Sequence, residues 1–158
     1  MSHPSDGGEV TALLRPHDTI EPVLVGTTTA RFVATGSLTN GHFGLFRWDM
    51  SAQAGGATPH YHRGFTESFY VLSGSVELYD GAKWVPATPG YFLFVPERGI
   101  HGFRNASGEP ASLFILFTPG HPREAYFTEL AEIRASGRQL SDEEWTDLYA
   151  RHDQYMVE

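Results

Sequence analysis

The sequence predicts an all-β domain of sandwich or barrel type, followed by two amphipathic α-helices. Turn-forming residue pairs recur at short intervals between about residues 28 and 118, and the segments between them are rich in β-branched and aromatic residues. Many short strands spaced by roughly 8–12 residues are typical of β-sandwiches and β-barrels. After Gly120 the apolar residues change to helical spacing, which predicts the helices. The turn-forming pairs are Asn40-Gly41, Gly55-Gly56, Ser73-Gly74, Asp80-Gly81, Pro89-Gly90, Arg98-Gly99, Ser107-Gly108 and Pro119-Gly120.

Short strand-forming segments lie between these turns. The clearest hairpin covers residues 75–87, because Asp80-Gly81 suits a tight turn between two strands. The expected strands comprise residues 29–36, 42–50, 67–73, 75–80, 91–96 and 112–119.

The first expected helix covers residues 122–136. Phe127, Leu130 and Ile133 fall on one face at helical spacing, and Gly137 follows as a typical terminating residue.

The second expected helix covers residues 141–152. Ser141 and Glu144 have the spacing of a capping box, in which each side chain bonds the other residue's main-chain N–H. One face then follows at helical spacing and comprises Trp145, Leu148, Tyr149 and His152.

Composition excludes several classes of protein. The chain has 158 residues, of which 41% are hydrophobic and 19% charged, which is typical of one compact domain. The net charge of −8 argues against a nucleic-acid or anionic membrane partner. There is no cysteine, so disulfides and thiolate ligands are excluded. No apolar run approaches the roughly 20 residues that span a bilayer, and the first residues do not resemble a secretory signal. We expect a soluble, cytoplasmic protein.

Two histidines and a glutamate form an unusual group in the middle of the chain. In a strand, side chains two residues apart point to the same face, so His60 and His62 present neighbouring imidazoles. A short turn through Gly64 brings Glu67, at the start of the next strand, back toward them. Two imidazoles and a carboxylate are costly to bury unless they are paired or bound to a cation.

His101 is the fourth candidate. It shares its strand parity with Phe103 and Asn105, so it too lies on a partly aromatic face. A single histidine of this kind is more often a hydrogen-bonded core residue than a ligand. Taken together, His60, His62, Glu67 and His101 predict a metal site. The alternative for the glutamate is an ion pair with Arg63, Arg98 or Arg104.

The spacing of these residues resembles the two motifs of the cupin superfamily. The first motif has His60, His62, Glu67 and Gly74, and the second has Gly90, Pro96, His101 and Asn105, with 15 residues between the two motifs. Two glycine positions of the family are occupied here by Ala54 and Arg98, which affects the expected turn geometry but none of the four ligands.

The resemblance implies a single antiparallel jelly-roll β-barrel with a metal inside its wider mouth. The implied organisation is a flexible N-terminal tail (residues 1–10), the barrel (11–120) and a C-terminal helical extension (121–158). Homodimers, which are common among such proteins, are implied as well.

Three neutral imidazoles and one carboxylate around a divalent ion leave one positive charge, which favours anionic ligands. Nitrogen and oxygen donors without sulfur suit Fe, Mn, Ni, Co or Zn. The resemblance extends to quercetin 2,3-dioxygenase-like members and implies a metal-dependent dioxygenase that consumes O₂ and acts on a small aromatic or enolisable substrate such as a flavonol. Glu67 would be both ligand and catalytic base. The alternatives are a non-redox isomerase, decarboxylase or polyketide cyclase, or a non-catalytic module that binds a small ligand.

Aromatic residues are expected to line the substrate pocket. Strand periodicity turns inward either the pair Phe46 and Trp48 or the pair Leu45 and Arg47, and the sequence leaves both options open. We expect the C-terminal helices to pack outside the barrel or at a dimer contact. In the alternative, one helix covers the mouth and Tyr126 or Phe127 contacts the ligand. The expected pocket residues are Phe46, Trp48, Phe69, Phe92 and Phe103.

Overall fold

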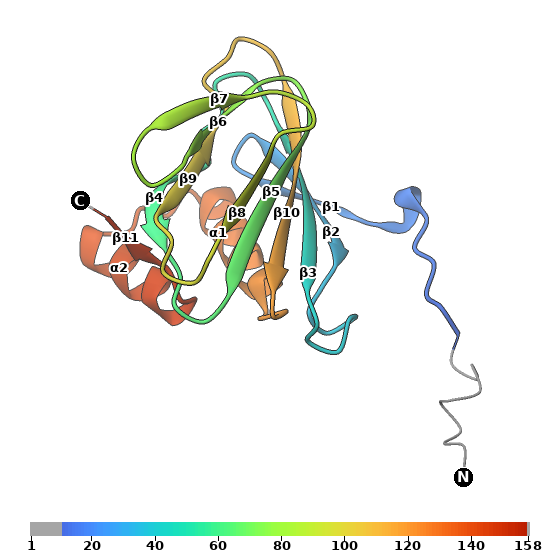
Figure 1. The fold of residues 1–158 in the computed structure, drawn as a ribbon. Coiled ribbons are helices and arrows are strands. Elements are labelled where there is room, and N and C mark those ends of the chain that lie inside the picture. The colour runs from blue at the N-terminus through green and yellow to red at the C-terminus, as the bar shows by residue number, and fades with distance from the viewer. Residues whose placement is uncertain (1–10, 158) are drawn as a thin grey trace.

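The computed structural model describes residues 11–157. The chain forms two antiparallel sheets that enclose a common core, followed by two helices (Figure 1). This is the predicted all-β jelly-roll arrangement with two C-terminal helices. Residues 1–10, which we expected to be a flexible tail, lie outside the described residues, and the division of the chain at residue 120 stays a prediction. No helix of the described residues is long and apolar enough to cross a membrane.

The larger sheet has six strands. Its central strands carry much of the core, and Ile115 pairs in register with Phe46 on one side and with Phe69 on the other. In spatial order the strands are β1 (Pro22–Val25), β2 (Thr28–Ala34), β3 (Gly44–Met50), β10 (Ala111–Thr118), β5 (Thr66–Ser73) and β8 (Phe92–Val95).

The smaller sheet has five strands. The predicted hairpin over residues 75–87 is confirmed as the β6–β7 pair. In the same sheet His60 pairs in register with His101. The spatial order is β11 (Tyr155–Met156), β4 (Ala57–Tyr61), β9 (His101–Arg104), β6 (Val76–Tyr79) and β7 (Trp84–Ala87).

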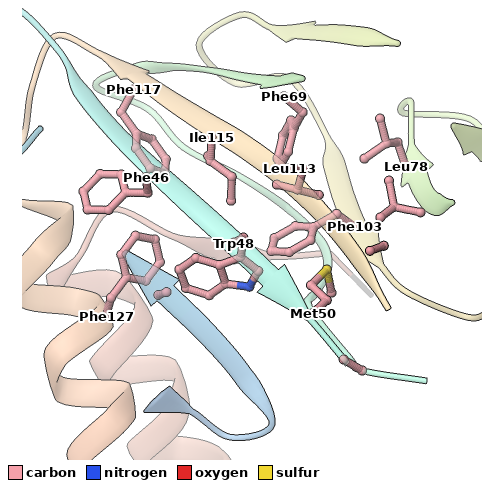
Figure 2. Close-up of a cluster of buried hydrophobic side chains, with 14 of the residues drawn as sticks. Phe46, Trp48, Met50, Phe69, Leu78, Phe103, Leu113, Ile115, Phe117 and Phe127 are labelled. Carbon is pink, nitrogen blue, oxygen red and sulfur yellow. The ribbon is translucent and has the colours of Figure 1, made fainter. Parts of the chain in front are cut away.

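The orientation of β3, which the sequence left open, is settled by burial. Phe46, Trp48 and Met50 are buried between the sheets, whereas Leu45 and Arg47 on the opposite face are only partly buried. Figure 2 shows the inward side chains of β3 among those of the other strands. Phe46 packs edge-on against Phe117 of β10, with ring centroids 5.6 Å apart, a favourable aromatic geometry.

Both predicted helices form. α1 (Arg123–Ser136) ends at Gly137, whose φ of 69° is the left-handed conformation that glycine adopts without strain. α2 (Asp142–Arg151) begins with the predicted capping box, in which Ser141 accepts from Glu144 N–H and the Glu144 carboxylate accepts from Ser141 N–H.

The expectation that the helices pack outside the β domain is wrong for α1. Tyr126 and Phe127 on its first turns are buried, and the Phe127 ring lies 4.8 Å from Trp48 and 5.1 Å from Phe46 (Figure 2). These aromatic side chains bury their surface by closing the core between the sheets, so α1 is part of the cavity wall.

Candidate metal centre

The four predicted ligands come together at one point between the two sheets. His60 on β4, His62 just after it and His101 on β9 come from the smaller sheet, and Glu67 on β5 comes from the larger one. One ligand atom from each lies within 4.8 Å of the others. All four side chains are buried, with 1% to 4% of their surface exposed.

Main-chain carbonyls fix the orientation of all three imidazoles. The Nδ1–H of His60 donates to Thr58 O at 2.7 Å, and that of His101 donates to Gly99 O at 2.9 Å. His62 Nδ1–H donates to Asp153 O, also at 2.7 Å. With Nδ1 protonated and engaged in each ring, Nε2 is the nitrogen left to bind a metal.

Glu67 completes the donor set. Its Oε2 lies 2.9 Å from His62 Nε2 and 2.6 Å from His101 Nε2. Three imidazole nitrogens and a carboxylate oxygen, without sulfur, are ligands that Fe(II), Mn(II), Ni(II), Co(II) and Zn(II) accept. The buried cluster therefore fits a divalent transition-metal ion. The predicted alternative partners of Glu67 lie elsewhere: Arg104 pairs with Glu77, and Arg63 packs over the Tyr155 ring.

In the metal-free cluster the pKa values of the histidines and the glutamate are shifted in different directions. Burial lowers the pKa of His60 to about 3, so this imidazole is neutral. Burial also lowers the pKa of His101, but the adjacent Glu67 carboxylate outweighs it and the net shift is upward. For Glu67, burial acts to raise the pKa, yet the charge of His101 and the hydrogen bonds from both histidines hold it well below its usual range. The hydrogen bond between His101 Nε2 and Glu67 Oε2 engages two of the candidate ligand atoms, so metal binding would release its proton.

The two departures from the family pattern leave the site intact. Arg98 adopts φ of 68°, the left-handed conformation usual for glycine, and its N–H donates to His62 O. Ala54 is buried, and its carbonyl accepts the Asn105 N–H at 2.9 Å. Both loops beside the histidines are therefore held by main-chain hydrogen bonds.

A cavity of about 250 Å³ opens onto the cluster at His60 and Glu67. Of the expected pocket residues, Trp48 and Phe103 line it. Phe46 and Phe69 are buried in the core and are not among its lining residues.

The prediction for Phe92 is wrong. Its side chain is 63% exposed, on the outer face of the edge strand β8. Strand β8 is apolar on both faces, so its sequence gave no contrast between inward and outward residues. The inward residue at its end is Val95, which is buried.

Arg123 and Gln154 are among the residues of the cavity wall that sequence reasoning missed. Arg123 shares the face of α1 that carries Phe127 and Leu130, at helical spacing, and this position could have predicted it. Tyr126 and Phe127, considered only as an alternative, also line the cavity. Gln154 and the carbonyl of Asp153 reach the site through the C-terminal segment, for which the sequence carries no comparable pattern.

Comparison with known sequences agrees with this geometry. A family model described as a cupin domain matches residues 46–117, which contain the whole cluster. Quercetin 2,3-dioxygenase from Bacillus subtilis (strain 168) is 30% identical over 82 residues, which are 52% of this chain and 24% of that protein. An uncharacterized protein from Aquifex aeolicus (strain VF5) is 35% identical over 63 residues, 40% of this chain and 51% of that one. The chain thus spans about a quarter and about half of the lengths of these two relatives.

Solved structures share the fold. KdgF from Halomonas sp. has a TM-score of 0.63 at 18% identity, covering 72% of this chain and 99% of that one. The polyketide cyclase RemF from Streptomyces resistomycificus has a TM-score of 0.60 at 24% identity, covering 70% of this chain and 82% of that one. Similarity at this level of identity shows the fold alone. The family match, the two-sheet fold and the clustered histidines and glutamate agree, and residues 46–117 form a cupin domain.

Proposed function

We propose that this protein is a metal-dependent dioxygenase acting on a small aromatic or enolisable compound, with His60, His62, Glu67 and His101 holding the metal. The observation that carries the proposal is a buried cluster of three imidazoles and one carboxylate that opens onto a cavity walled by aromatic rings. The sequence similarity to quercetin 2,3-dioxygenase supports oxygenation as the reaction class.

Each residue has a defined task in this proposal. A divalent transition metal bound at the cluster would supply a Lewis acid for an ionised substrate oxygen and a centre able to react with O₂. The three histidines hold and orient that site through their Nδ1 hydrogen bonds. Glu67 is ionised, and its Oε1 makes no hydrogen bond to the histidines, so it is placed to take the hydroxyl proton of the substrate.

The cavity wall binds the body of the substrate. Trp48, Phe103 and Phe127 offer flat apolar surfaces against which a planar ring can stack. The same side chains limit water around the buried carboxylate, which strengthens its interaction with a bound proton or cation.

The proposal is tested by oxygen consumption. Metal-free protein is reconstituted anaerobically with Fe(II), Mn(II), Co(II), Ni(II) or Zn(II) in turn, and O₂ uptake is followed after addition of quercetin. We expect uptake with at least one redox-active metal and none with the His60→Ala/His62→Ala variant. Uptake that is equal in that variant would overturn the site assignment, and no uptake with any metal and a panel of enolisable diketones would overturn the oxygenase proposal.

A second candidate is a non-redox metal-dependent isomerase, decarboxylase or cyclase. Arg123 favours it, because a buried cation in the cavity wall can stabilise an enolate without any oxidant. Substrate conversion by the zinc-loaded protein without O₂ uptake would support this candidate over the dioxygenase.

A further inference from the structure

Arg123, the first residue of α1, is an unusual cavity-lining residue. It is 4% exposed, and it shares the cavity with Glu67 and His60. Its guanidinium carbon lies over aromatic rings, of which Tyr126 is the closest, with its ring centroid 4.4 Å away. Phe65 and Phe117 follow at 5.1 and 5.2 Å.

Phe127 is the fourth ring around the Arg123 guanidinium carbon, and the four ring centroids lie 4.4 to 5.6 Å from it. Cations bind favourably to the faces of aromatic rings, and such contacts gain strength when water is excluded. The rings hold the guanidinium in place but bring no negative charge to it.

The hydrogen bonds of Arg123 go to neutral acceptors. One terminal nitrogen donates to His152 O at 2.7 Å, and the other donates to Gln154 Oε1 at 3.2 Å. A guanidinium carries five N–H donors, and Nε is buried with no acceptor among the described residues. No ion pair joins Arg123 to a carboxylate in that part of the chain, and the Oε2 of Glu67 is engaged by His62 and His101.

A buried cation whose hydrogen-bond acceptors are all neutral is costly, and burial lowers the pKa of Arg123 by more than the nearby charges of Glu67 and Asp153 raise it. An anion that enters the cavity would supply the missing charge and form charge-assisted hydrogen bonds, which are about twice as strong as neutral ones. Arginine is well suited to a planar carboxylate, because its N–H groups match the two oxygens.

We propose that Arg123 binds a carboxylate group of the substrate, so that the substrate is an aromatic or enolic acid. Its carboxylate lies against Arg123, its planar body packs on the cavity side of Trp48 and Phe127, and its reacting oxygen points toward Glu67. This inference rests on the proposed function, since both use the same cavity.

The test uses metal-free protein and two probes of nearly equal shape, benzoate and benzamide, with binding measured by isothermal titration calorimetry. We expect benzoate to bind about 10-fold or more tightly than benzamide, in line with the strength of a hydrogen bond to a charged group. Arg123→Met should remove that preference, and Arg123→Lys should retain part of it. Arg138→Met is the control, because Arg138 is an exposed arginine just after the same helix and does not line the cavity. It should leave the preference within about 3-fold of wild type.

Three results would overturn the inference: equal binding of the two probes, no binding of either probe, or an unchanged preference for benzoate in Arg123→Met. If that variant does not fold, the comparison of the two probes in the wild type and in Arg123→Lys decides. Because no metal is present, the outcome is independent of the oxygen-uptake experiment, and failure of either proposal can be recognised separately.

Discussion

His62 Nδ1 lies 2.7 Å from the carbonyl oxygen of Asp153, a residue 91 positions later in the chain. The corresponding acceptors of His60 and His101 are Thr58 and Gly99, each only two residues before its histidine. The C-terminal segment is therefore part of the metal centre, because it sets the orientation of one ligand. Strand β11 fixes this segment by pairing with β4, the strand that carries His60.

Asp153→Ala should weaken metal binding although Asp153 would not touch the metal. The carboxylate of Asp153 accepts hydrogen bonds from the main-chain N–H groups of Arg63 and Gly64 at 2.8 and 2.7 Å. The backbone φ of Asp153 is 55°, a left-handed conformation that disfavours alanine. Loss of an interaction that orients a ligand typically lowers metal affinity by about 10- to 100-fold. Titration calorimetry with Zn(II) measures the effect. Asp153→Asn should lose less of the Zn(II) affinity than Asp153→Ala. Asp147→Ala, at an exposed position, should keep the wild-type affinity. Equal affinity in all four proteins would contradict the orienting role.

Glu67→Gln should separate metal binding from turnover. Glutamine keeps the shape and one oxygen donor but cannot take a proton, so kcat should fall by about 100-fold or more. Metal affinity should fall less than in His62→Ala, which removes a ligand outright. Metal content after dialysis and initial rates measure the two effects. Normal turnover by Glu67→Gln would show that another group is the base.

The metal-free protein should lose stability as the pH falls below about 6. The folded-state pKa of His60 is about 3, below its ordinary value of 6.5, so between these values the unfolded chain binds a proton that the folded chain does not. The depressed pKa of Glu67 acts in the same direction at lower pH, because its stabilisation is lost as the carboxylate becomes protonated. His101 has a raised pKa and acts oppositely: its stabilisation is present at low pH and is lost as the pH rises through that pKa.

Urea unfolding from pH 7 to pH 4 measures this balance. In His60→Phe the slope of the unfolding free energy should be smaller by up to about 1.4 kcal/mol per pH unit, the value for one proton. Identical slopes in the two proteins would show that His60 is protonated in the folded state.

The part of the site that the sequence predicted depends on local spacing. His60 and His62 are two residues apart, Glu67 follows after one short turn, and His101 shares its strand parity with Phe103, so strand geometry alone places each side chain on the inner face. The same periodicity could not decide between Phe46 and Leu45, because a strand has two faces and both residues are apolar.

The rest depends on contacts between distant segments. Arg123 and Asp153 enter the site only because α1 closes the core and β11 pairs with β4. The main-chain carbonyl of Asp153 also could not be recognised from the residue type, because every residue has a main-chain carbonyl. The position of the C-terminal segment therefore required the structure.

Phe127→Ala should be strongly destabilising and Phe92→Ala nearly neutral, although the same atoms are removed. Phe127 is buried against Trp48 and Phe46, so its loss should reduce the free energy of unfolding by about 3–5 kcal/mol, the usual cost of truncating a core phenylalanine. It should also weaken the binding of planar ligands, because a wall of the cavity is removed. Phe92 is exposed on β8, and its replacement should change stability by no more than about 0.5 kcal/mol and leave ligand affinity unchanged. Denaturant unfolding and benzoate titration of both variants measure the difference. Equal losses would mean that α1 does not cover the cavity in solution, since Phe127 would then be as exposed as Phe92.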